Sequence, residues 1–173
     1  MIEQIQLSLE TRQLALRVMR ETDLPNVYQL HSIDVVNQYL PYQTWQGYQD
    51  ALDWYEKVKL RRATSEAEQF VIIERGENKL IGTIIVFGFD KAERTIEVGY
   101  VLHPDHWGQG LMQEALQSFL SVLEKALSLS AVQAVVEQPN TASLKLLSKL
   151  DFTHINTRVD EQGIRLEDWI KVF

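Results

Sequence analysis

The chain has 173 residues, of which 45% are hydrophobic and 24% are charged, and its formal net charge is −7. This is an ordinary globular composition, and we expect one domain over residues 1–173. The acidic balance argues against nucleic-acid binding, which needs a concentrated basic surface. The chain has no cysteine and no apolar run of membrane-spanning length. We therefore expect no disulfide, no membrane segment and a cytoplasmic location.

The sequence pattern of the first part of the chain predicts one strand followed by three helices. Apolar and polar residues alternate in the strand, and apolar residues recur at steps of three and four in the longest helix. Thr22 or Asp23 is the candidate N-cap of the first helix, and Pro41 stops the second. The expected ranges are 14–19 for the strand and 21–32, 34–40 and 48–63 for the helices.

The hydrophobic period changes in the middle of the chain. Short, almost continuously apolar runs predict a meander of central strands that are buried on both faces. A long amphipathic helix, a strand, a shorter helix and a hairpin follow. Their expected ranges are 69–74, 79–89 and 94–102 for the meander, 108–129 and 141–150 for the helices, and 131–136, 152–159 and 163–173 for the remaining strands. This order predicts an α/β domain whose mixed, mostly antiparallel sheet of about seven strands carries helices on both faces.

Two glycines, Gly108 and Gly110, stand directly before the most strongly amphipathic helix. The first turn of a helix has unpaired N–H groups and a partial positive charge, and glycine lets phosphate oxygens come close to them. The turn therefore predicts a site for a phosphate or pyrophosphate, unless the glycines only relieve crowding. It is not a Walker A loop, and Gln113 occupies the third glycine position of the dinucleotide fingerprint.

The segment PDHWGQGLMQEAL, residues 104–116, resembles motif A of the GNAT superfamily of N-acetyltransferases. In that superfamily an Arg/Gln-x-x-Gly-x-Gly/Ala signature holds the pyrophosphate of acetyl-coenzyme A. The resemblance continues in order through LETRQLALRVMRETDLPNVYQLHSIDVVNQYLP, EVGYVL and QPNTASLKLLSKLDF, which are similar to the ribosomal-protein-alanine (RimJ/RimL-like) branch. It implies a GNAT-like domain in which two parallel strands, 95–103 and 131–137, splay apart and admit the pantetheine arm. The chain departs from the pattern at Asp105, in place of Arg or Gln, and at Asp151, in place of Gly.

The resemblance also implies roles for individual residues. Glu97, in mid-strand where glutamate is disfavoured, would act as the base for the acceptor amine through a water molecule. Ser143 would act as the general acid near the sulfur, and Asn140 would contact the pantetheine arm. The alternatives are an arginine partner or a solvated position for Glu97, a helix N-cap for Asn140 and a solvated serine for Ser143. The expected cofactor-binding set is Leu102, His103, Trp107, Gly108, Gln109, Gly110, Leu111, Met112, Asn140 and Ser143, with Leu102 and His103 acting through their backbones.

Three aromatic residues, Tyr39, Tyr42 and Trp45, cluster in QYLPYQTW. They either line the acceptor pocket or cover the core. The four histidines show no metal-ligand spacing, so we expect no metal.

The leading hypothesis is an N-acetyltransferase that moves acetyl from acetyl-coenzyme A to a primary amine by direct attack in a ternary complex. The acceptor is a protein N-terminal amine or a small-molecule amine. A non-catalytic acyl-coenzyme-A-binding regulatory module is the alternative, and it would need neither Glu97 nor Ser143. A structural domain without a ligand is a third interpretation. The sequence leaves the acceptor and a homodimeric state open.

Overall fold

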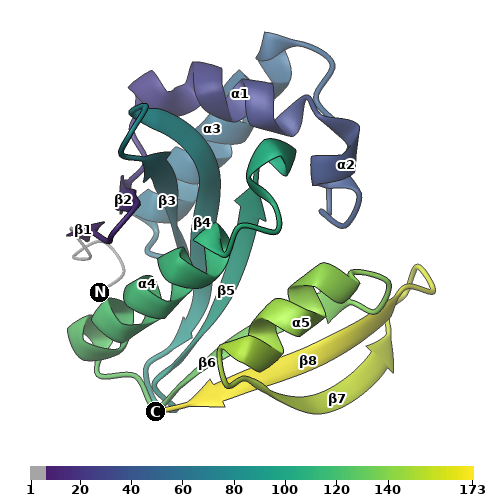
Figure 1. Ribbon diagram of the computed structural model, residues 1–173. Coiled ribbons are helices and arrows are strands. Elements are labelled where there is room, and N and C mark those ends of the chain that lie inside the picture. The colour runs from purple at the N-terminus through teal and green to yellow at the C-terminus, as the bar shows by residue number, and fades with distance from the viewer. Residues whose placement is uncertain (1–6) are drawn as a thin grey trace.

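In the computed structural model, which describes residues 7–173, an eight-stranded sheet carries helices on both faces (Figure 1). The strand order is β1-β2-β3-β4-β5-β6-β8-β7, and β5 and β6 are the parallel neighbours in an otherwise antiparallel sheet. The strands are β1 (Ser8–Glu10), β2 (Leu14–Val18), β3 (Ala67–Glu74), β4 (Lys79–Asp90), β5 (Thr95–Leu102), β6 (Ala131–Glu137), β7 (Thr153–Val159) and β8 (Arg165–Val172). The helices are α1 (Leu24–His31), α2 (Asp34–Asn37), α3 (Tyr48–Ala63), α4 (Leu111–Leu127) and α5 (Thr141–Lys149). The predicted fold class is confirmed.

Three predicted elements differ in detail from the structure. The sheet has eight strands because the short strand β1, for which the sequence carries no strong pattern, pairs with β2. Helix α2 ends at Asn37, three residues earlier than predicted, and the Asn37 carboxamide donates to the carbonyls of His31 and Ile33. Asp23 occupies the N-cap position of α1, as predicted, but its side chain does not cap the helix. Its carboxylate pairs with Arg17 at 2.7 Å and makes no capping bond to α1.

Two hydrophobic clusters lie on opposite faces of the sheet. Helices α4 and α5 pack on one face, where the Phe70 and Phe119 rings meet edge to face with centroids 4.9 Å apart. Helices α1 and α3 cover Val71 on the other face. Strand β3 therefore has buried side chains on both faces of the sheet, which explains its continuous apolar sequence. Within residues 7–173, no helix is both long and apolar enough to cross a membrane.

Glu114 fastens the start of α4 to the turn between β1 and β2. Its carboxylate accepts hydrogen bonds from the Thr11 hydroxyl and from both the backbone and the side-chain N–H groups of Gln13. Burial by itself would raise the pKa of Glu114, but these hydrogen bonds outweigh it and lower the pKa. The glycine turn that precedes α4 is thereby held in place relative to the sheet.

Replacement of Glu114 with glutamine is expected to lower the free energy of unfolding at pH 7 by about 1 kcal/mol, because a charge-assisted acceptor at a partly exposed position is lost. A carboxylate with a lowered pKa in the folded state stabilises the protein above its unfolded pKa of about 4.3. It loses that effect as the pH falls through the folded pKa. Urea unfolding of both proteins from pH 7 to pH 3 should show the difference shrinking on acidification. A difference independent of pH would contradict this electrostatic origin.

Candidate active site

The parallel pairing of β5 with β6 is short. It runs through Thr95, Ile96 and Glu97, which face Ala131 to Gln133, and it then stops although both strands continue. Strand β5 remains paired with β4 up to Leu102. The two strands therefore diverge beyond Glu97, as the resemblance to the acetyltransferases implied. We call the wedge between them the splay.

The register identifies which backbone groups of β5 face the splay. The His103 N–H donates to the Ile81 carbonyl of β4 at 2.7 Å. Antiparallel strands alternate between hydrogen-bonded and non-hydrogen-bonded pairs, so Tyr100 and Leu102 direct their N–H and C=O groups away from β4 and towards β6. Strand β4 uses the His103 N–H, so this group is not directed at the splay, and the predicted role of the His103 backbone in cofactor binding stays a prediction. Tyr100, which was not among the predicted site residues, has its backbone N–H and C=O groups at the splay.

The glycine turn lies at the open end of the splay, between β5 and α4. Gly108 and Gly110 have φ values of +72° and +77°, which side chains rarely tolerate, and a Cβ built on either meets no atom within 4 Å. Gly110 is the N-cap of α4 and supplies no side-chain cap, so the first amides of the helix keep the donor capacity that an anion requires. The Gln109 carboxamide closes the turn by donating to the Asp105 carbonyl at 2.8 Å.

The other predicted residues of the turn divide into buried and exposed ones. Leu111 and Met112 have side chains that are buried in the core cluster beneath α4, so only their amides are available to a ligand. Trp107 is 48% exposed, and its indole N–H donates to the Leu102 carbonyl at 2.7 Å. That bond uses the Leu102 carbonyl and ties the turn to the end of β5.

The first turn of α5 faces β5 across the splay. The Asn140 side-chain oxygen accepts from the Ser143 amide at 3.2 Å, so the N-cap alternative describes the Asn140 oxygen correctly. The Ser143 hydroxyl lies 2.6 Å from the Tyr100 hydroxyl. Ser143 is therefore not a freely solvated serine. Two hydroxyl groups from opposite sides of the splay meet at one point.

Glu97 lies where β5 and β6 part, on the sheet face opposite to Tyr100. Burial raises the pKa of its carboxyl, nearby Arg158 opposes this effect and Asp168 adds to it. Arg158 forms its ion pair with Asp168, Nε to carboxylate at 3.1 Å, rather than with Glu97. The structure therefore places a half-buried carboxylate, with a pKa moved towards neutrality, next to the splay.

The three aromatic residues predicted at the acceptor pocket have different surroundings. Trp45 is only 7% exposed and belongs to the core cluster beneath α1 and α3, which agrees with the alternative that it covers the core. Tyr42 is half-buried against the same cluster, 3.5 Å from the His31 ring nitrogen, and burial raises its pKa. Tyr39 is closest to the splay, because its hydroxyl donates to the Pro139 carbonyl at 3.3 Å, next to the start of α5.

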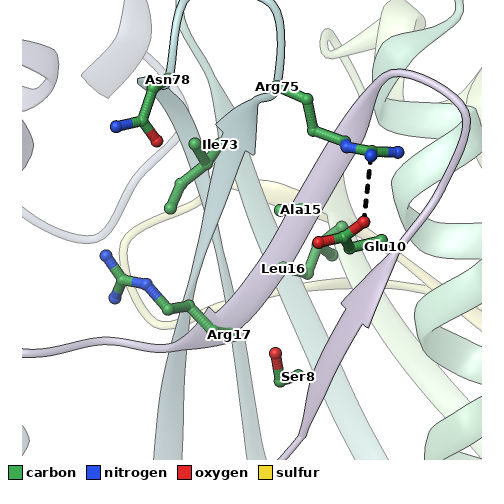
Figure 2. A pocket seen from close by; sticks show the side chains of 8 residues that line it. All are labelled: Ser8, Glu10, Ala15, Leu16, Arg17, Ile73, Arg75 and Asn78. Atoms are coloured by element: carbon green, nitrogen blue, oxygen red, sulfur yellow. Dashed lines mark ion pairs between the residues drawn. The ribbon is translucent and has the colours of Figure 1, made fainter.

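A hollow of about 250 Å³ lies apart from the splay, at the β1–β3 edge of the sheet (Figure 2). Both arginines at its wall are already paired, Arg17 with Asp23 and Arg75 with Glu10. Neither charge is left to attract a ligand there. Among residues 7–173, no group of three or more His, Asp or Glu side chains is arranged to hold a metal ion.

Comparison with known proteins identifies the family of this chain. A family model described as an acetyltransferase (GNAT) domain matches residues 13–153. The chain belongs to the GNAT acetyltransferase family. This acetyltransferase is 31% identical over 145 residues to p20, an uncharacterised N-acetyltransferase of Bacillus licheniformis, and the match covers 84% of this chain and 82% of the relative. The predicted family and enzyme class are confirmed.

Solved structures share the fold at low sequence identity. Spermidine N-acetyltransferase from Vibrio cholerae, in complex with CoA and spermine, superposes with a TM-score of 0.81 at 18% identity, covering 94% of this chain and 96% of that one. Ribosomal-protein-S5-alanine acetyltransferase from Vibrio fischeri gives a TM-score of 0.80 at 19% identity, covering 96% of each chain. The GNAT acetyltransferase fold is thus present along nearly the whole chain.

Proposed function

We propose that this acetyltransferase moves the acetyl group of acetyl-coenzyme A to a primary amine by direct attack in a ternary complex. The observation that carries the proposal is the splay with its chemically different sides. Tyr100 and Ser143 face the α4–α5 side, and Glu97 faces the opposite side. A thioester that enters from one side meets an amine from the other where β5 and β6 part.

On the cofactor side, the amides of the glycine turn would hold the pyrophosphate. The pantetheine arm would then run along β5 like an added strand and pair with the backbone of Tyr100. The Asn140 carboxamide nitrogen would reach the same arm, since its oxygen is used as the N-cap. Asp105 adds no positive charge here, so affinity for the phosphates depends on the amides and the helix dipole.

On the acceptor side, Glu97 would take a proton from the incoming ammonium, directly or through water. A base poised by a raised pKa is suited to this task at neutral pH. Because Arg158 and Asp168 pair with each other, the Glu97 carboxylate carries the net negative charge of these three groups, which favours a cationic amine. Tyr39 would border the acceptor. A protein N-terminal amine and a small amine both meet these requirements, and the relatives include enzymes named for each.

A thermal-shift and thiol-release experiment tests the proposal. Acetyl-coenzyme A at about 100 times its Kd should stabilise the protein by roughly 2.7 kcal/mol. A panel of polyamines, amino acids and N-terminal peptides should then release coenzyme A thiol, and a chain without cysteine adds no thiol background. Binding without turnover on any amine would favour the non-catalytic regulatory module. The absence of both binding and turnover would favour the third interpretation, a structural domain without a ligand.

A further inference from the structure

The contact between Tyr100 and Ser143 joins two elements that flank the splay. The two hydroxyl oxygens lie 2.6 Å apart, and the residues stand 43 positions apart in the sequence. Tyr100 packs against the core cluster under α4 and α5, which fixes its ring. Ser143 is fixed from its own side, because its amide donates to the Asn140 side chain. The contact is therefore held from both ends.

Either hydroxyl can donate in this contact, and the phenol, as the more acidic of the two groups, is the better donor. Burial raises the pKa of Tyr100 to about 12, with the hydrogen bond to Ser143 opposing that effect, so the phenol is protonated at neutral pH. A serine hydroxyl is both a donor and an acceptor. If Tyr100 donates to the Ser143 oxygen, the hydrogen of Ser143 is left to point elsewhere. A hydroxyl that rotates freely would spend only part of its time in any one direction.

We propose that Tyr100 is a positioning residue that holds the Ser143 hydroxyl with its hydrogen directed at the thioester sulfur. The inference rests on the proposed function, in which Ser143 acts at the sulfur. Attack forms the C–N bond and gives a tetrahedral intermediate. As the C–S bond breaks, the nitrogen passes one proton to the Ser143 oxygen while Ser143 gives its own to the departing sulfur. Ser143 ends as it began, the products are an amide and a thiol, and Tyr100 keeps its proton throughout.

A double-mutant cycle tests this coupling. Ser143→Ala should lower kcat about 100-fold, in the range of general acid–base catalysis. Tyr100→Phe should lower kcat about tenfold and leave the Kd of acetyl-coenzyme A, measured by calorimetry, within about twofold of the wild-type value. In the Ser143→Ala background Tyr100→Phe should have no further effect, because the hydroxyl it orients is gone. If the double mutant instead shows the product of the two single-mutant losses in kcat, the proposal is overturned. A Tyr100→Phe enzyme with the wild-type kcat would overturn it as well.

Tyr55→Phe is the matched control, because Tyr55 is a buried tyrosine in α3 outside the splay. It should keep the wild-type kcat. If Tyr100→Phe fails to fold, 3-fluorotyrosine at position 100 preserves the shape and makes the phenol a stronger donor. It should raise kcat about twofold, and an unchanged or lower kcat would overturn the proposal. A wild-type enzyme without turnover would instead refute the proposed function, so the two failures are distinguishable.

Discussion

Replacement of Gly110 with alanine is expected to weaken acetyl-coenzyme A binding by at least about 100-fold. The left-handed backbone at this position is costly for any side chain, and relaxing it turns the first amides of α4 away from the phosphates. A hydrogen bond to a charged group contributes about 1.5–3 kcal/mol, so the loss of two such bonds reaches this factor. Isothermal calorimetry with acetyl-coenzyme A measures the change in Kd.

Gly163 provides a control with matched backbone strain. It has a φ of +82° in the β7–β8 turn, away from the splay, and a Cβ there also meets no atom within 4 Å. Gly163→Ala should lower the thermal stability about as much as Gly110→Ala, since both carry a left-handed penalty of about 1–2 kcal/mol. Its Kd for acetyl-coenzyme A should equal that of the wild type. Undiminished binding by Gly110→Ala would refute the proposed pyrophosphate site.

Replacement of Glu97 with glutamine is expected to lower kcat by about 100- to 1,000-fold while acetyl-coenzyme A still binds. Glutamine has nearly the same shape but does not accept a proton at neutral pH, so the change removes the base and keeps the packing. Steady-state rates with the best amine of the panel, combined with calorimetry, separate the two effects. A Glu97→Gln enzyme with an unaltered pH–rate profile would remove this carboxylate from the mechanism.

The charged neighbours of Glu97 give a graded version of the same test. A base works when deprotonated, so kcat/KM should rise with pH through the raised pKa of Glu97. Arg158→Gln removes the charge that lowers this pKa and should move the rise to higher pH by about half a pH unit. This is the size of a charge interaction across several ångströms of largely aqueous surroundings. Asp168→Asn should move it to lower pH, and shifts of equal sign would contradict the assignment.

Much of the fold could be predicted from local patterns. The 3.6-residue periodicity placed α3 at Tyr48–Ala63, as observed, and the apolar runs placed the three meander strands within about two residues of their true bounds. The glycine turn could be predicted because two glycines directly before an amphipathic helix are visible in the sequence itself, and both have a positive φ in the structure. Local rules sufficed wherever the conformation of a segment depends on its own residues.

Other parts of the site depend on pairing that no local pattern records. The pairing of His103 with β4 follows from register, which joins residues about 20 positions apart. The Tyr100 hydroxyl meets its partner across the splay, and in sequence it is one more aromatic residue in a buried strand. Arg158 and Asp168 lie close to Glu97 and come from a hairpin that the sequence predicted only as the closing element of the sheet. These contacts depend on tertiary structure, so sequence reasoning missed them.

The early end of the pairing between β5 and β6 has a consequence for how the empty protein exchanges its amide protons with solvent. The N–H of Tyr100 faces the splay instead of a neighbouring strand, so it should exchange with deuterium much faster than the N–H of Val101, which is turned towards β4. A bound pantetheine chain that pairs there as an extra strand would slow that one amide selectively. The contrast between two adjacent residues would then report occupancy directly, without any chemical label on the protein.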